Sequence, residues 1–172
     1  MRYPHALFVT VAVVSLMLAA CEKHGNWPEG MEPIHWDRDA CAECNMAISD
    51  HRFAVELVRG KPNRGVFKFD DIGCLIAWSE RTSKKAGTRP WWEVPEEEAG
   101  VRVWVADFDS PPGSRDALRW LGPRAARYIE RTSPMGFNLA AVENAAENTV
   151  GFDEVLKRIQ AHRHDHGHGE GR

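Results

Sequence analysis

The chain has 172 residues, with 22 Lys and Arg against 25 Asp and Glu, eight His and four Cys. Apolar residues make up 43% of it, which is typical of a globular domain rather than of a disordered or fibrous chain. The net charge of −3 and the lack of a basic stripe exclude the electrostatic footprint of a nucleic-acid-binding protein. The length fits one domain or two very small lobes, and it excludes a large enzyme with a separate cofactor domain.

Residues 1–20 have the pattern of an export signal peptide. Arg2 is their only charged residue, a short and mostly apolar run follows, and small residues stand at its end. The run is shorter than the roughly 20 apolar residues that span a bilayer. Residues 18–21, Leu-Ala-Ala-Cys, resemble the bacterial lipobox, in which the cysteine is diacylated and becomes the first mature residue. A plain cleaved signal peptide is the alternative.

The lipobox predicts a lipoprotein that is anchored through Cys21 and holds its soluble part at a membrane surface. Glu22 follows the cysteine where an Asp would be the inner-membrane signal. By resemblance to the usual bacterial sorting rule, this favours the periplasmic face of the outer membrane over the inner membrane. Thiols in that compartment meet oxidising conditions, so a reduced cysteine there needs a specific reason.

Polar segments flank the part of the chain that is predicted to fold. Residues 21–39 contain Pro28 and Pro33 without a sustained period, and we expect a disordered, lipid-anchored tether. Residues 162–172 are rich in His and Gly, and we expect a disordered tail. The folded domain is therefore predicted over residues 40–161.

The first half of this domain predicts two strands followed by a helix. Residues 53–58 alternate, with Phe53, Val55 and Leu57 on one face, and residues 66–69 form a second strand. Asp70 or Asp71 then caps a helix with apolar positions at 72, 75, 76 and 78. Residues 79–100 are charged and contain proline, and we expect an exposed loop.

The second half repeats this order. Strands are predicted over residues 101–108, 126–130 and 139–143, with a turn at 109–113, and Asp153 is predicted to cap a last helix. Residues 66–72 and 149–155 share a strand, an aromatic residue, an Asp cap and an acidic residue, while residues 54–56 repeat at 141–143. The echo predicts an α+β fold of two strand–strand–helix lobes, over about 40–100 and 101–161. Each lobe would present a methionine, Met46 or Met135, from the loop before the corresponding strand.

Three sulfur-bearing side chains, Cys41, Cys44 and Met46, lie within six residues. A Cys-x-x-Cys pair alone fits half a zinc site, a redox-active dithiol or a structural disulfide. The thioether of Met46 favours a copper site over these three, because thiolate together with thioether selects Cu(I). In an extended segment the side chains of Cys44 and Met46 would point to the same side. Filling the core is the alternative role of this methionine.

Further candidate ligands are scattered along the chain. Pro134 and Gly136 place Met135 in a loop near the surface, where it is well placed to complete a soft-metal site. His51 could add a nitrogen ligand or be a surface imidazole without metal. Cys74 lies among apolar helix positions and is predicted to be a buried core thiol. The alternating imidazoles of the tail predict weak binding of Cu(II), Zn(II) or Ni(II), with a merely solvated tail as the alternative: His162, His164, His166 and His168.

Four motifs in order resemble the NosL family, the copper-binding lipoproteins that are accessory to nitrous oxide reductase. They are Cys-x-x-Cys-x-Met at 41–46, the Phe-Asp helix start at 69–70, Val-x-Asp-Phe at 105–108 and Ser-Pro-Met-Gly at 133–136. The resemblance covers roughly residues 40–160 and the lipobox. It implies two small ββαβ lobes that resemble a domain of the organomercurial lyase.

The resemblance also implies the site and the function. One Cu(I) per chain would be held by Cys44, Met46 and Met135, with Cys41 less secure because some family members have a single cysteine there. The protein would be no enzyme but a carrier that hands copper to nitrous oxide reductase, or to its assembly machinery, while the copper centre is built. Delivery to another copper enzyme stays open, because residues 79–100, Cys74 and the His tail lie outside the family pattern.

Two alternatives come from other classes of protein. A thiol–disulfide oxidoreductase would use Cys41 and Cys44 and leave both methionines unexplained. A structural lipoprotein would carry a disulfide between Cys41 and Cys44 or between Cys44 and Cys74. The sequence also excludes a hydrolase, because it contains neither a nucleophile elbow nor a pair of catalytic carboxylates.

Overall fold

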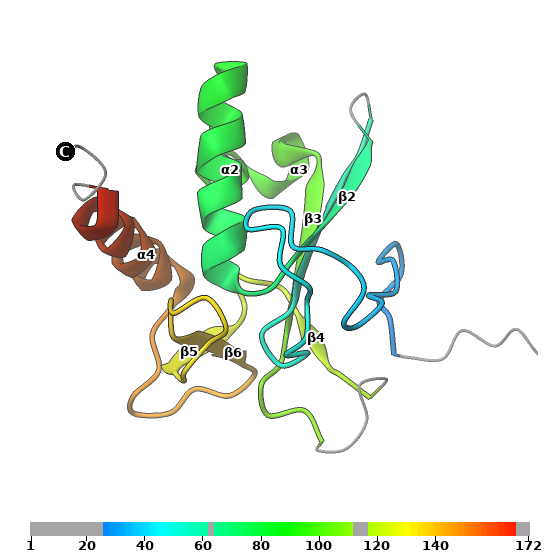
Figure 1. The fold of residues 1–172 in the computed structure, drawn as a ribbon, viewed down its shortest axis with the longest axis vertical. Helices are drawn as coiled ribbons and strands as arrows, with labels where there is room; N and C mark the ends of the chain where they lie inside the picture. The colour runs from blue at the N-terminus through cyan, green and yellow to red at the C-terminus, as the bar shows by residue number, and fades with distance from the viewer. Residues whose placement is uncertain (1–25, 62–63, 112–116, 168–172) are drawn as a thin grey trace, which may run out of the picture.

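The computed structural model describes residues 26–61, 64–111 and 117–167 (Figure 1). The predicted signal peptide, Cys21 and His168 lie outside these residues. Within the described ranges, no helix is both long and apolar enough to cross a membrane. The architecture is α+β, as the sequence predicted, with two antiparallel sheets and helices packed between and beside them.

The larger sheet has four antiparallel strands in the order β2-β1-β3-β4. Val55 of β1 pairs with Phe69 of β2 on one side and with Val105 of β3 on the other. The alternating pattern of residues 53–58 produces β1, although Phe53 itself precedes the strand and packs in a separate apolar cluster with Ile129. The four strands are β1 (Val55–Arg59), β2 (Gly65–Phe69), β3 (Val101–Ala106) and β4 (Trp120–Leu121).

Helix α2 (Ile72–Ala86) covers one face of this sheet and begins where the sequence predicted. Asp71 is its N-cap, because its carboxylate accepts a 2.9 Å hydrogen bond from the main-chain N–H of Cys74. Gly87 ends the helix in the left-handed conformation with φ of 66°. The predicted loop at 79–100 is therefore wrong in its first part, because the polar residues after Ser79 form the solvent-facing end of α2. Two short helices follow, the 3-10 helix η1 (Trp91–Glu93) and α3 (Glu96–Ala99).

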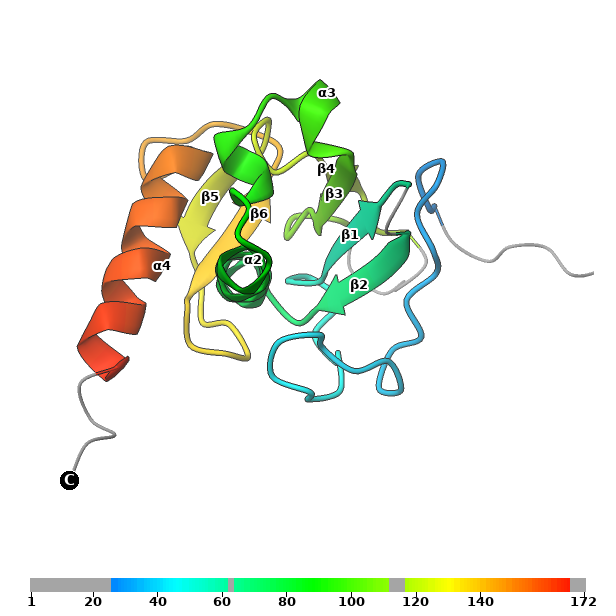
Figure 2. The ribbon, with the colours of Figure 1, turned by 90° about the horizontal axis from the view of Figure 1, so that it is seen from above.

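The other face of the sheet is covered by residues that were expected to be a tether. Met31 and Ile34 are buried in the main core. The buried Glu56 carboxylate of β1 accepts a 2.8 Å hydrogen bond from Glu32 N, and Lys68 of β2 donates to Pro33 O at 2.7 Å. From residue 26 onward the tether prediction is wrong, because two well-placed apolar side chains and these hydrogen bonds fix the segment without any regular period. Figure 2 shows the segment in blue, away from α2.

The smaller unit contains β5 (Arg127–Glu130), β6 (Leu139–Val142) and α4 (Phe152–Gly167). Its strands pair antiparallel, and an isolated bridge joins Tyr128 to Val150. Figure 2 looks along α2, which lies between the two sheets, with α4 at the outer side. Asp153 lies in the first turn of α4 rather than at its cap, and the helix extends through residue 167 into the predicted tail.

The division into lobes differs from the expected one at residue 101. Strand β3, which the sequence assigned to the second lobe, pairs with β1 along its length. The described chain is therefore a ββαβ unit, made of β1, β2, α2 and β3 with the short β4 added at the edge of its sheet, followed by a smaller ββα unit. The physical reason is hydrogen bonding: the main-chain groups on both edges of β1 have partners only when β3, which follows α2 in the chain, pairs with the edge that β2 leaves open.

Candidate metal centre

The Cys-x-x-Cys-x-Met motif forms a closed loop rather than an extended segment. Cys41 N donates to Met46 O at 2.8 Å, and Asn45 N donates back to Cys41 O at 2.9 Å. Asn45 takes a left-handed conformation with φ of 61°, which Asn tolerates better than most residues. The expectation that Cys44 and Met46 point to the same side of an extended chain is therefore wrong.

This loop is fastened to the end of β2 and to α2. Ala42 N donates to Lys68 O at 2.9 Å, which holds the loop beside the last residues of β2. Arg81 of α2 forms a 2.7 Å ion pair with Glu43. Because α2 begins directly after β2, the loop lies at the start of that helix.

The structure brings three thiols together at this place. The sulfur atoms of Cys41, Cys44 and Cys74 all lie within 4.8 Å of one another, and all three cysteines are free. Cys41 and Cys74 are buried, whereas Cys44 is partly exposed. The candidate structural disulfides therefore do not occur in this structure. Cys74 is buried as predicted, but its sulfur faces the other two thiols rather than apolar side chains alone.

One of the three thiols is acidic. The hydrogen bond from the Cys74 thiol lowers the pKa of Cys41 to about 5, and main-chain N–H groups of the loop act in the same direction. The same hydrogen bond, together with burial, raises the pKa of Cys74. Burial raises the pKa of Cys44. At neutral pH the cluster therefore holds a thiolate at Cys41 and two thiols that are ready to lose a proton to a metal.

Two carboxyl groups border the cluster. Asp70 and Asp71 are both buried, and burial raises the pKa of each, that of Asp70 to about 6 with a further rise from the Cys41 charge. Asp70 Oδ1 has no hydrogen-bond partner among the described residues. Thiolate and carboxylates together make the surroundings negative, which favours a cation.

The Ser-Pro-Met-Gly loop packs against the same end of α2. Ser133 Oγ donates a 2.9 Å hydrogen bond to Asp71 Oδ2. The ring of Phe137 lies so close over Gly73 that a β-carbon there would stand 2.1 Å from it. Met135 is half-buried and packs against the main core. The fold thus brings the loop that carries Met135 next to the helix turn that carries Cys74.

The other predicted ligands lie elsewhere or at the rim. Met46 is 51% exposed, and its main-chain N–H bonds to the Cys44 sulfur. His51 stacks edge-on against Trp36 with ring centroids 6.0 Å apart and is not in the thiol cluster. His162 packs against the Phe137 ring at 5.4 Å. His164 and His166 lie on α4, so the first part of the tail is helical rather than disordered.

Cys74 is the member of the thiol cluster that the sequence did not place in the candidate site. Its position three residues after the Asp71 cap fixes it in the first helical turn, but nothing local shows that residues 41–44 meet it there. Metal–sulfur bonds of about 2.3 Å would place three sulfurs in a trigonal site roughly 4 Å apart. The cluster therefore fits a soft ion such as Cu(I), and it lacks the fourth ligand of a structural zinc site among the described Cys, His, Asp and Glu.

No protein-family model and no curated protein matches this chain. A comparison with solved structures finds the crystal structure of the copper chaperone NosL from Shewanella denitrificans. The two chains are 16% identical, the TM-score is 0.46, and the match covers 78% of this chain and 89% of the other.

Proposed function

We propose that this protein binds one Cu(I) ion at Cys41, Cys44 and Cys74 and delivers it to a client enzyme. The observation that carries the proposal is the meeting of three free thiols, one of them acidic, within 4.8 Å. Sulfur ligands without a hard fourth donor favour Cu(I) over Zn(II), Mg(II) or Ca(II). A bound ion would also keep these thiols reduced in an oxidising compartment.

The site is built so that copper can leave it. Cys41 and Cys74 hold the ion from the buried side, while Cys44 is partly exposed and the neighbouring Met46 is half exposed. An incoming sulfur or nitrogen ligand from a partner can therefore approach from the Cys44 side before the buried bonds break. We infer that the thioethers of Met46 and Met135 assist as weak ligands during capture and transfer. This is the behaviour of a carrier rather than an enzyme.

The client and the location rest on the sequence motifs. We propose that the client is nitrous oxide reductase, or its assembly machinery, during construction of the copper centre, because the four ordered motifs resemble the family with that role. The lipobox supports anchoring through a diacylated Cys21 at the periplasmic face of the outer membrane. The His tail would add a second, weaker site for divalent ions.

The test is a Cu(I) titration of the reduced, unlipidated chain 22–172 against a chromogenic chelator. We expect one tight equivalent that survives replacement of the four tail histidines by asparagine. Cys41→Ser, Cys44→Ser and Cys74→Ser should each lower the affinity by at least about a hundredfold. Wild-type affinity in all three variants would refute the site. An effect confined to Cys41→Ser and Cys44→Ser would leave Cys74 as a core residue.

Thiol–disulfide exchange is the second candidate, because Cys41 is an acidic thiol within a Cys-x-x-Cys motif. Its geometry is unfavourable, since the acidic Cys41 is buried and the more exposed Cys44 has a raised pKa. Reduction of insulin disulfides by the metal-free protein would support this function. We expect a rate no higher than that of the Cys41→Ser variant.

A further inference from the structure

A cleft that the copper site does not use runs along the C-terminal half of α2. It consists of two adjoining cavities of about 230 and 390 Å³ that share Trp91, Ala99 and Val101. We call the two together the α2–β3 cleft. Ser83 in its wall lies nine residues beyond Cys74 on the same helix, about 13 Å along the axis. Cavities of this combined size accept small organic molecules.

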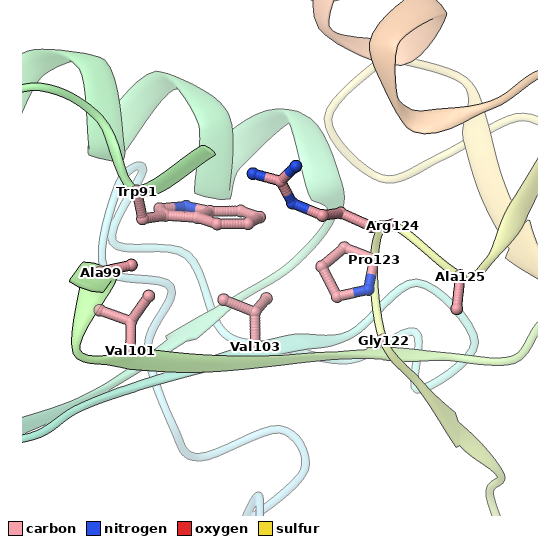
Figure 3. A pocket seen from close by; sticks show the side chains of 8 residues that line it. All are labelled: Trp91, Ala99, Val101, Val103, Gly122, Pro123, Arg124 and Ala125. Carbon is pink, nitrogen blue, oxygen red and sulfur yellow. The ribbon is translucent and has the colours of Figure 1, made fainter. Parts of the chain in front are cut away.

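The smaller cavity has a flat apolar wall. Figure 3 shows the Trp91 indole seen edge-on above Val101 and Val103 of β3, with the Pro123 ring at the end of the row. The guanidinium of Arg124 lies beyond the indole and donates to Trp92 O at 2.7 Å. A planar, apolar group is the shape that such a wall accommodates.

Two buried polar atoms of the cleft lack partners. Ser79 is 3% exposed and lines the larger cavity, and its Oγ has no hydrogen-bond partner within the described part of the chain. The Nε1 of Trp91, which lines both cavities, is likewise buried without an acceptor among the described residues. Buried hydroxyl and indole N–H groups are nearly always satisfied, so both point to a ligand with acceptor atoms.

The charged side chains around the cleft indicate the sign of the charge that such a ligand would carry. Arg59 lies over the rings of Phe67 and Trp78, 5.5 Å from each centroid. Arg89 donates a hydrogen bond to the main-chain carbonyl of Glu93. No carboxylate among the described residues forms an ion pair with either guanidinium in this structure. Among the described side chains that line the larger cavity, Glu98 is the one acidic group, and the two guanidiniums outnumber it.

We propose that the α2–β3 cleft binds a small organic anion: an acid group on a flat apolar body. The body lies on Trp91 and β3, the acid group faces Arg59 and Arg89, and its oxygens accept from Ser79 and Trp91. The proposal is independent of copper binding, because none of these residues is within the thiol cluster.

A matched pair of fluorescent probes tests both parts of this description. 1-Anilinonaphthalene-8-sulfonate is an aromatic anion, and N-phenyl-1-naphthylamine has the same rings without the sulfonate. We expect the folded chain 22–172 to bind one sulfonate probe per molecule, at least about tenfold more tightly than the neutral probe. Equal affinity for the two probes, or several weak sites, would overturn the proposal.

Variants locate the site. Arg59→Gln and Arg89→Gln should each weaken the sulfonate probe about five- to tenfold and leave the neutral probe unchanged. Arg59→Lys should keep most of the binding, and Arg38→Gln removes the same charge from an exposed position outside the cleft and should bind like wild type. Circular dichroism and thermal midpoints must match for each variant that is compared. If Arg59→Gln and Arg89→Gln bind as Arg38→Gln does, the cleft is not the site.

Discussion

Ser133 donates a 2.9 Å hydrogen bond to Asp71, whose other carboxylate oxygen caps the N–H of Cys74. One buried carboxylate thus joins the loop that carries Met135 to the helix turn that carries Cys74, a thiol of the candidate metal centre. The two partners are 62 residues apart and belong to the two different units of the fold. The contact fixes the position of the Met135 loop relative to the first turn of α2.

Replacing Ser133 by alanine should therefore loosen both the fold and the site. The change removes the donor to Asp71 Oδ2 and the acceptor of Asn138 N, so a buried carboxylate loses a hydrogen bond. We expect a loss of about 1–3 kcal/mol in the free energy of unfolding, measured by urea denaturation. Thr132→Ala, at an exposed neighbouring position, is the control. If both variants lose the same small amount, the bridge contributes nothing.

The pH dependence of copper binding follows from the three thiols. Cys41 has a pKa of about 5 and is ionised at neutral pH, whereas the raised pKa values of Cys44 and Cys74 keep both protonated. Copper must then displace two protons, so its apparent affinity should rise about a hundredfold per pH unit between pH 6 and pH 8. Chelator competition at several pH values measures this slope. In Cys74→Ser one proton fewer is displaced, and the slope should fall to about tenfold per pH unit.

The buried carboxyl group of Glu56 should make the free energy of unfolding depend on pH. Its side chain is fully buried, and burial raises its pKa to about 7 from an ordinary value of 4.5. Between these two values the unfolded chain has lost the proton and the folded chain has not, so stability falls as the pH rises through that window. The full effect at pH 8 is about 3 kcal/mol.

Glu56→Gln should remove this dependence. The amide keeps an oxygen that can accept from Glu32 N, and it places no charge in the core. We expect the variant to be more stable than wild type at pH 8 by roughly 3 kcal/mol and about equal to it at pH 4.5, measured by urea unfolding. A constant difference at all pH values would show that Glu56 does not titrate in this window.

Much of the fold was predictable because local rules and the tertiary structure agree. Alternation gave β1, and the strong apolar pattern of residues 101–108 gave β3. Asp71 marked the start of α2 correctly, because an N-cap is a local interaction between residues three positions apart. The end of α2 was missed because its solvent-facing residues resemble those of a polar loop.

The site was predictable only in part, for a related reason. Cys41 and Cys44 stood out as a motif, but their meeting with Cys74 depends on a loop that hydrogen-bonds to the end of β2. Likewise, Met31 and Ile34 are too sparse to show a period, and only the finished sheet gives them a surface to cover. The predicted boundary between the lobes is wrong because β3 pairs with β1, which lies far from it in the sequence, and no local pattern indicates that pairing.

The two methionines offer the sharpest test of how the second unit takes part in copper binding. Met135 lies in the loop that Ser133 ties to Asp71, and Met46 is half exposed beside Cys44. Leucine has a similar volume to methionine but has no sulfur, so Met46→Leu and Met135→Leu remove a ligand with little change in packing. We expect each to weaken Cu(I) binding several-fold, less than any of the three cysteine substitutions, because a neutral thioether is a weaker donor than a thiolate. Met31→Leu, in the core on the far face of the sheet, should bind copper like wild type. If Met135→Leu also binds like wild type, the second unit contributes no ligand and the cysteines alone hold the ion.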